Sequence, residues 1–448
     1  MTADRIEIAF EGGGAGEGPL SWGQLENWAT IQATKSWFPL GGASRLLPGT
    51  TMGQVVELMR YAMVRYPVLR TRLRFEPDGR VVQVVHAHGG LELGVVEAGA
   101  RDPAKVAAEL CDRWRAQEID FARDWPLRVA VIVQDGQPSH MATLISHLAV
   151  DAAGLETMIA EMAALKAAPV AGIQPLEQAT WQRSAAGGRQ NAGALRYWEG
   201  VYRTISPHRF ARRGGQAGPG PRYRHGEFDS AVLLPAVRAL AVASGLSSST
   251  VFLALYATAL RDIGAVEPVV IRPIVSNRFR PGVAAVVCTV AQAGILVVDV
   301  ADVPFDEALR RVNAAVMPAY KYAYFNHGDM LALEQRVARE RGVEFELGVF
   351  VNDRHVFRMP PDLDAAAAAR AVEAAAASVG VLRWTGGQDG PALEPLFVEI
   401  DDLPELADGI RIGLHLDTRH VSLADAEALA CAMERTALAA ARSAAAAA

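Results

Sequence analysis

The sequence predicts a mixed α/β (α+β) fold arranged in two lobes. The chain has 448 residues, which is more than one hydrophobic core normally organises. Hydrophobic residues make up 51% of it and charged residues 21%, which is enough apolar material for sizeable cores. Segments with the period-2 alternation of strands and segments with helical spacing follow one another along the chain. We expect lobes at residues 1–170 and 176–448, with a linker around residues 167–175.

In the first lobe, residues 5–10 alternate as a strand does, and glycines crowd residues 12–18. The glycine spacing does not match the dinucleotide-binding fingerprint, and Pro19 stands where a helix should open, so we expect a flexible turn. Ser21 is a candidate helix N-cap. The other expected elements are a helix over 51–66, a strand at 81–85, and a hairpin of strands 127–134 and 140–145 around an Asp-Gly turn.

The second lobe is also expected to mix helices and strands. Residues 208–225 are rich in glycine and arginine and are expected to form a mobile surface loop. The expected helices cover residues 194–204, 247–264, 364–378 and 422–441, and the expected strands cover 269–274, 294–300, 345–351 and 410–416.

Charge, cysteine usage and hydropathy argue against several classes of protein. The net charge of −6 does not favour binding to nucleic acid or to a membrane surface. Cys111, Cys288 and Cys431 are too far apart for a disulfide framework or a zinc motif, and no metal site is expected. The first residues lack the apolar core of a signal peptide, and no apolar run approaches the ~20 residues of a membrane span. We therefore expect a soluble, cytoplasmic protein. Separately, we expect a monomer, although the sequence does not determine the oligomeric state.

The segment with the strongest chemical signal lies around His147. An apolar run over residues 141–145 ends at Ser146 and His147, Asp151 follows, and helical spacing begins near residue 155. A histidine just past a strand end is held by a rigid element and exposed by a loop, and its ordinary pKa suits proton transfer. The alternative is an ordinary buried histidine, followed by an aspartate that only caps the helix.

Five segments, taken in order, resemble the condensation domains of non-ribosomal peptide synthetases, within the chloramphenicol-acetyltransferase-like superfamily. The resemblance covers essentially the whole chain. Residues 20–28 resemble the opening motif of that family, residues 65–73 its "RHExLRTxF", residues 146–152 its active-site "HHxxxDG", residues 197–198 its aromatic pair, and Asn277-Arg278 the arginine after a core strand.

The chain departs from the family pattern at four positions. Ser146 replaces the first histidine of "HHxxxDG", and Ala152 replaces its glycine. In the segment that corresponds to "GxFVN", Cys288 stands for the glycine and Gln292 for the asparagine. The second histidine, His147, and the aspartate, Asp151, are retained.

The resemblance implies a V-shaped pseudo-dimer of two lobes, with His147 in a central tunnel lined by Ala152 and Gly154. Acyl or peptidyl carrier proteins would dock at the tunnel mouths and supply phosphopantetheine-bound thioesters. The chain would then need no cofactor of its own. It would be free-standing and would act on carrier proteins in trans, or on a small-molecule acceptor.

The resemblance also suggests roles for single residues. His147 and Asp151 are the predicted catalytic residues. His147 would either accept a proton from the attacking amine or hold that amine in line. Asp151 would act through structure, in a bidentate ion pair with Arg278. Arg70 would brace the site or lie on a solvated face, and Ser146 would replace an imidazole that points away from the tunnel.

Three functions remain open at this stage. The first is a condensation enzyme that forms an amide, or an ester with a hydroxyl acceptor, in natural-product biosynthesis. The second is an acyltransferase whose donor is an acyl-coenzyme A. The third is a catalytically degenerate domain that serves as a docking platform for a tailoring enzyme. The retained His147 favours the two enzymes, because such platforms usually lose that histidine.

Overall fold

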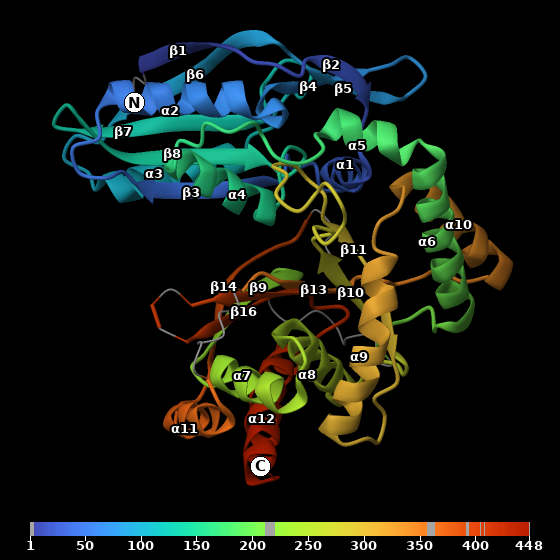
Figure 1. Cartoon of the computed structure of the whole chain (residues 1–448). Coiled ribbons are helices and arrows are strands. Elements are labelled where there is room, and N and C mark those ends of the chain that lie inside the picture. The colour runs from blue at the N-terminus through green and yellow to red at the C-terminus, as the bar shows by residue number, and fades with distance from the viewer. Residues whose placement is uncertain are drawn as a thin grey trace. The chain divides into compact units, whose positions relative to one another are not determined.

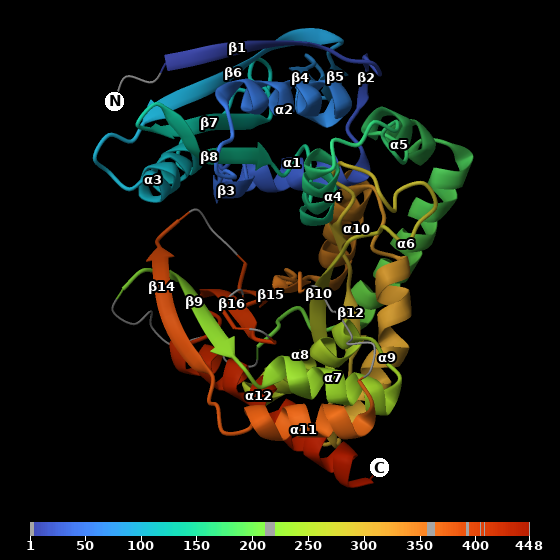
Figure 2. The same cartoon turned by 60° about the vertical axis from the view of Figure 1, so that its left-hand side comes forward.

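The computed structural model describes residues 4–210, 220–355, 363–390, 394–403, 405–406 and 408–447. By contacts, the chain divides into two compact units (Figures 1 and 2). Unit 1 contains Met1–Ala192, Ser276–Gln292 and Asn326–Gly328, and unit 2 contains Gly193–Val275, Ala293–Phe325 and Asp329–Ala448. Both units contain helices and strands, which confirms the mixed α/β fold. The V-shape, the tunnel and the lobe boundary at 170–176 stay predictions.

Unit 1 is built on a five-stranded sheet with the order β1-β6-β7-β8-β3. Only β6 and β7 pair in parallel. Unit 1 also contains a three-stranded sheet with the order β2-β5-β4. The strands are β1 (Asp4–Glu11), β2 (Gly16–Pro19), β3 (Pro39–Arg45), β4 (Thr71–Phe75), β5 (Val81–Val85), β6 (His88–Glu97), β7 (Leu127–Gln134) and β8 (Gln137–Ser146).

The helices of unit 1 cover its sheets with apolar faces. Helix α3 packs on β8 and β3, and the buried core there joins Val106 and Leu110 of α3 to Ile132 and Leu144 of the sheet. The elements are α1 (Trp22–Thr34), α2 (Met52–Arg65), the 3₁₀ helix η1 (Pro67–Arg70), α3 (Pro103–Arg115), α4 (Ala152–Ala163) and α5 (Pro175–Gln182), and α6 (Ala185–Thr204) runs from unit 1 into unit 2.

The predicted hairpin is confirmed, and the predicted glycine turn is partly wrong. Strands β7 and β8 pair antiparallel around Asp135 and Gly136, whose φ angles are 51° and 75°. Ser21 caps α1, as expected. Gly16–Pro19, however, forms the edge strand β2 and pairs with β5. Pro19 is tolerated there because an edge strand leaves one row of backbone groups unpaired.

Unit 2 is built on an eight-stranded sheet with the order β11-β10-β13-β15-β16-β9-β14, with β12 paired to β10. The strands are β9 (Tyr223–Ser230), β10 (Val269–Val275), β11 (Gln292–Ala293), β12 (Leu296–Val298), β13 (Val349–Asp353), β14 (Val381–Gln388), β15 (Leu396–Asp402) and β16 (Ile410–Asp417). The strand β11 begins at Gln292, which is the last residue of the unit 1 segment Ser276–Gln292.

Helices α7, α8, α11 and α12 gather on one side of this sheet (Figure 2). They enclose the large apolar core of unit 2 together with the inner faces of the strands. The helices are α7 (Leu233–Ser244), α8 (Ser248–Asp262), α9 (Phe305–Lys321), α10 (His327–Arg341), α11 (Ala365–Ala375) and α12 (Leu423–Ala447). The sequence had indicated α8, α11 and α12, but it had not indicated α7, α9 or α10.

The arginine-rich loop expected over residues 208–225 differs from the expectation where the structure describes it. Arg209 is buried, and this burial lowers its pKa to about 10. Arg222 forms an ion pair with the buried Asp417. Tyr223 already begins β9. Arg212 and Arg213 lie outside the described residues.

Within the described ranges, we find no single helix long and apolar enough to cross a membrane. The bent pair α7 and α8 meets that criterion jointly, on length and composition alone. Both helices contribute to the buried core of unit 2.

Candidate active site

His147 follows the last residue of β8, as the sequence predicted. Strand β8 lies between β7 and β3, so it is held from both sides. At the end of the strand, Ser146 is fully buried; its Oγ donates to the carbonyl of Trp37 at 2.8 Å and accepts from the Leu148 N–H at 3.2 Å. The serine hydroxyl therefore ties the strand end to the neighbouring backbone, which fixes the position from which His147 extends.

The backbone of His147 is anchored on three sides. Its N–H donates to the carbonyl of Phe38 at 2.8 Å. Its carbonyl accepts from the side-chain amide of Asn27 at 2.9 Å and from the hydroxyl of Thr289. Asn27 belongs to α1, and Thr289 to the returning segment Ser276–Gln292, so three distant parts of unit 1 meet at this one residue.

The imidazole ring of His147 is half-buried and is also held. The Asn27 amide nitrogen lies 3.0 Å from His147 Nδ1. The ring stacks on Phe38 with centroids 4.9 Å apart and planes inclined by 14°. Phe38 has a φ of 52°, in the left-handed region that a bulky residue rarely adopts. This unfavourable backbone conformation places both its carbonyl and its ring against His147.

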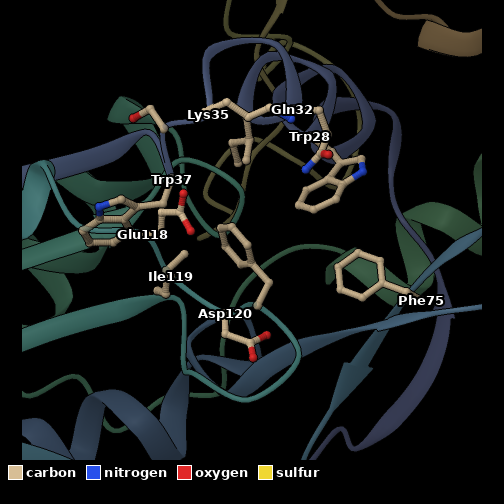
Figure 3. A pocket seen from close by; sticks show the side chains of 11 residues that line it. Trp28, Gln32, Lys35, Trp37, Phe75, Glu118, Ile119 and Asp120 are labelled. Carbon is tan, nitrogen blue, oxygen red and sulfur yellow. The ribbon is translucent and has the colours of Figure 1, made fainter.

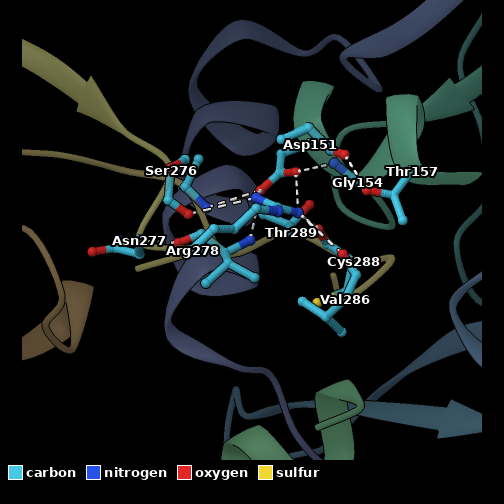
Figure 4. A network of polar contacts seen from close by, with 12 residues as sticks. Asp151, Gly154, Thr157, Ser276, Asn277, Arg278, Val286, Cys288 and Thr289 are labelled. Carbon is cyan, nitrogen blue, oxygen red and sulfur yellow. Dashed lines mark hydrogen bonds and ion pairs between the residues drawn. The ribbon is translucent and has the colours of Figure 1, made fainter. Parts of the chain in front are cut away.

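Asp151 is the N-cap of α4 and is also the partner of Arg278 (Figure 4). Arg278 Nη1 donates to Asp151 Oδ2 at 2.8 Å, and Nη2 donates to Oδ1 at 2.6 Å, which is the bidentate geometry expected from the sequence. Three backbone N–H groups also donate to the carboxylate: those of Gly154, Val290 and Ala291, at 2.8, 2.9 and 3.0 Å. The predicted pairing is confirmed, and the capping alternative holds at the same time.

The electrostatics of this pair follow from its burial. Only 2% of the Asp151 side chain and 11% of the Arg278 side chain are exposed. Burial alone would raise the pKa of Asp151, but the charge of Arg278 and the hydrogen bonds from Arg278, Val290 and Gly154 outweigh it, so the pKa is lowered. The carboxylate is therefore ionised at neutral pH and is committed to its partners.

Arg278 is aimed at Asp151 by the backbone before it. Asn277 is buried with a φ of 57°, a left-handed conformation that asparagine tolerates, and its side chain donates to the carbonyl of Val290 at 3.2 Å. Arg278 Nη2 additionally donates to the carbonyls of Val286 and Cys288, both at 3.2 Å. One guanidinium thus fastens the segment Ser276–Gln292 to the start of α4.

Gly154 lies against this network, and Ala152 lies at its edge. A Cβ on Gly154 would come within 2.9 Å of the Cys288 carbonyl oxygen and 3.1 Å of Arg278 Nη2, so the close approach requires glycine. Ala152 is the first residue of α4 and is half-buried. The predicted tunnel-lining roles of both residues stay predictions.

Arg70 braces a different part of unit 1. It is buried, and its guanidinium donates to the carbonyls of Met63, His86 and Gly13. A Cβ on Gly12 would meet the Arg70 side chain at 2.8 Å, which explains one of the glycines after β1. The alternative of a solvated arginine face is wrong for this residue, and its contacts are structural.

Cys288 is placed as a buried filler. Its Sγ accepts from the side-chain amide of Gln178 at 3.0 Å, and burial raises the pKa of the thiol to about 12. Such a thiol is not ionised at neutral pH and is a poor nucleophile. The fourth departure, Gln292, is also buried and donates to Glu26 of α1 at 3.0 Å.

Sequence reasoning missed Asn27, Phe38 and Thr289. Asn27 lies within the opening motif over residues 20–28, but nothing in a sequence shows that a helix residue faces a histidine 120 positions away. Thr289 is 142 positions from His147. Only the fold brings these groups together.

Unit 1 also has a separate cavity of about 240 Å³, whose lining residues do not include His147 (Figure 3). Trp28 and Phe75 are neighbours in its lining, with ring centroids 5.6 Å apart. Its lining residues are Trp28, Ile31, Gln32, Lys35, Ser36, Trp37, Phe75, Glu118, Ile119, Asp120 and Phe121. Across the described part of the chain, no cluster of three or more His, Cys, Asp or Glu residues could hold a metal ion.

Comparison with known proteins places these contacts in a family. The model of the family "Condensation domain" matches residues 52–353. A Salinispora arenicola (strain CNS-205) protein, named as a probable nonribosomal peptide synthetase, CymA, is 25% identical over 328 residues, which is 67% of this chain. A chain of the linear gramicidin synthase of Brevibacillus parabrevis is 27% identical over 148 residues, 30% of this chain. The chain spans only 4% and 3% of the lengths of these two relatives.

Solved structures show the same fold at low sequence identity. A structure on condensation domain-mediated chain release from the enacyloxin polyketide synthase aligns with a TM-score of 0.71 and 20% identity, covering 95% of this chain and 83% of that chain. The X-domain from teicoplanin biosynthesis aligns with a TM-score of 0.70 and 18% identity, covering 95% of each chain. The X-domain also aligns in its complex with OxyB, with a TM-score of 0.69 and 19% identity over 95% of this chain and 93% of that chain.

We predict that Asp151→Ala destabilises unit 1 by about 3–5 kcal/mol, because it leaves the Arg278 charge buried without its partner. The measurement is urea unfolding. The matched control is Asp112→Ala, which removes an exposed carboxylate from its ion pair with Arg115 and should cost about 0–1 kcal/mol. Equal losses from the two variants would contradict the structural role of the pair.

The acid dependence of stability should follow the lowered pKa of Asp151. Its folded pKa lies below the ordinary value of 3.8, so the carboxylate stabilises the fold above pH 3.8. That contribution is lost as the pH falls through the folded pKa. The stability difference between wild type and Asp151→Asn should therefore shrink below pH 3.8. A difference that grows on acidification would have the wrong sign.

We predict that Cys288 reacts with a maleimide only when the chain unfolds, because the thiol is buried and its pKa is about 12. Mass spectrometry of peptides after brief labelling, with and without denaturant, measures this. Rapid labelling of Cys288 in the native chain would overturn its assignment as an inert filler.

Proposed function

The chain belongs to the condensation-domain family, and we propose that it transfers an acyl or aminoacyl group from a carrier-protein thioester to an amine acceptor. The observation that carries the proposal is the fixed position of His147 at the end of β8, where backbone, ring and neighbouring segment all hold it. A histidine that had lost its role would not need an unfavourable Phe38 backbone beside it.

The proposed reaction forms one bond and breaks one. The amine nitrogen attacks the thioester carbonyl carbon, and the C–S bond then breaks. The amine loses a proton, the departing sulfur gains one, and the products are an amide and a free thiol. A hydroxyl acceptor would give an ester by the same steps. The transition state needs alignment of the two reactants and stabilisation of the oxyanion.

Direct attack by the acceptor fits the residues near His147 better than an acyl-enzyme. A covalent route needs an activated hydroxyl or thiol beside a base. The Cys288 thiol is buried with a pKa of about 12, and the Ser146 hydroxyl donates to the Trp37 carbonyl. Neither the Cys288 thiol nor the Ser146 hydroxyl is therefore activated to attack the thioester. We therefore assign catalysis to His147 and positioning to the pair of Asp151 and Arg278.

The proposed partners follow from the family. Acyl or peptidyl carrier proteins would supply the donor on a phosphopantetheine arm, and the chain would need no cofactor of its own. The acceptor would be a second carrier-bound group or a small molecule. An acyl-coenzyme A would present the same phosphopantetheine thioester without a carrier protein, so this donor is the first alternative to test.

A second candidate function is a docking platform for a tailoring enzyme. The X-domain complex with OxyB supports it, because that domain aligns with this chain with a TM-score of 0.69. The retained and well-anchored His147 favours the enzyme over the platform.

We predict that His147→Ala abolishes amide formation while the fold survives, because the ring contacts Asn27 and Phe38 at the surface of the strand end and is only half-buried. The assay would offer three donors, namely acyl-pantetheine, acyl-coenzyme A and an acyl thioester on a carrier protein, each with a panel of amines. Products would be detected by mass spectrometry. The matched control is His140→Ala, in the strand that leads to His147.

In that assay His140→Ala should behave like wild type. Turnover by His147→Ala close to that of wild type would contradict a catalytic role for His147. Product from wild type only with carrier-loaded thioester would select the carrier route, whereas equal use of acyl-coenzyme A would select the alternative donor. No product from wild type with any donor, together with binding of a tailoring oxygenase, would select the docking platform.

We also predict that Ala152→Gly keeps activity and accepts bulkier amines, whereas Ala152→Trp blocks turnover. Ala152 is the first helical residue after Asp151, so its methyl group would narrow a tunnel that runs beside His147. Initial rates with small and bulky amines measure the change. Normal turnover by Ala152→Trp would place this residue away from the substrate path.

A further inference from the structure

The side-chain amide of Asn27 makes two contacts with the same residue. Its nitrogen, Nδ2, lies 2.9 Å from the carbonyl oxygen of His147 and 3.0 Å from the ring nitrogen Nδ1. Both contacts involve one atom, and an amide NH₂ group has two hydrogens to donate. Asn27 therefore contacts both the backbone carbonyl and the ring of His147 through one nitrogen atom.

The carbonyl contact fixes which end of the amide faces His147. A carbonyl oxygen only accepts hydrogen bonds, so the atom against it must be the NH₂ group. In the reversed orientation, Oδ1 of Asn27 would face the carbonyl oxygen at 2.9 Å, with two acceptors in contact and no proton between them. The same NH₂ nitrogen lies 3.0 Å from Nδ1, and a donor at that distance is matched by an unprotonated Nδ1 that accepts its second hydrogen.

We infer that Asn27 is a positioning residue that holds the neutral His147 ring in the tautomer protonated at Nε2. A neutral imidazole carries one N–H, and the hydrogen bond made by one ring nitrogen decides where the proton sits. The stacked Phe38 ring keeps the imidazole plane in place. Turning the ring by half a turn would remove Nδ1 from Asn27 and lose the hydrogen bond.

This tautomer decides which role His147 can play, if the proposed function is correct. In the resting state Nε2 carries a proton, so it donates a hydrogen bond and has no lone pair to accept a proton from an amine. The natural acceptor for this N–H is the thioester carbonyl oxygen, which gains negative charge on attack. His147 then stabilises the oxyanion, and the proton lost by the amine passes to the departing sulfur.

The direct experiment is nuclear magnetic resonance of the full chain with ¹⁵N-labelled histidine, at a pH where the ring is neutral. Two-bond ¹H–¹⁵N correlations distinguish a protonated ring nitrogen from an unprotonated one, and His147→Gln assigns the signals. In wild type, Nε2 should be the protonated nitrogen and Nδ1 the unprotonated one. This readout needs no substrate, so it stands or falls separately from the proposed function.

Two variants test whether Asn27 is the cause. In Asn27→Leu, the Thr289 hydroxyl still donates to the His147 carbonyl, so the backbone stays satisfied while Nδ1 loses its donor. The two tautomers should then mix, and both ¹⁵N shifts should move toward intermediate values. In Asn27→Asp, the carboxylate accepts only, so the proton should move to Nδ1. Gln32→Leu, an exposed amide on the same helix, is the matched control and should leave the spectrum unchanged.

The outcomes are decisive in either direction. Protonation at Nδ1 in wild type, or identical His147 shifts in wild type and Asn27→Leu, would overturn the inference. If the spectra agree and the chain is active, Asn27→Leu should lower kcat by about 10²–10³-fold, the loss expected for a misplaced oxyanion donor, with little change in KM. Spectra that agree in a chain without activity would refute the proposed function and leave the tautomer assignment intact.

Discussion

The arrangement of the site depends on the buried ion pair between Asp151 and Arg278. Asp151 ends the loop that carries His147 and caps α4, whereas Arg278 belongs to a segment that returns to unit 1 more than a hundred residues later. The pair therefore fixes that segment against the loop. Once it is fixed, Thr289 reaches the His147 carbonyl, and Gly154 allows the backbone of Cys288 to lie against the first turn of the helix. Removing either charge would leave the other buried without a partner, so the two residues are constrained together.

Local patterns predicted the parts of the site that adjacent residues determine. The apolar strand 140–145, the Asp-Gly turn and the capping aspartate are short-range signals, and each corresponds to β8, its hairpin or α4. The ion pair between Asp151 and Arg278 was expected from family resemblance rather than from any local pattern. Asn27, Phe38 and Thr289 were missed because their contacts with His147 are tertiary. Residues 16–19 were misassigned because a glycine-rich edge strand lacks the β-branched residues that mark most strands.

Three of the four departures from the family pattern are accommodated by specific contacts. Ser146 ties the strand end to Trp37, Cys288 accepts from Gln178, and Gln292 donates to Glu26. Ala152 adds one methyl group at the first position of α4. None of these contacts displaces His147 or Asp151. The departures therefore leave in place the two side chains on which acyl transfer would depend.

The central claim is that acyl transfer occurs by direct attack of the acceptor, assisted by His147, with no covalent acyl-enzyme. It is tested most directly by mass spectrometry of the intact chain and of the product during a single turnover, with excess chain over an acyl thioester and an amine present. The account predicts that amide appears while the mass of the chain stays unchanged at every time point. A chain that transiently gains the mass of the acyl group, or a thioester that disappears without amide formation, would contradict it.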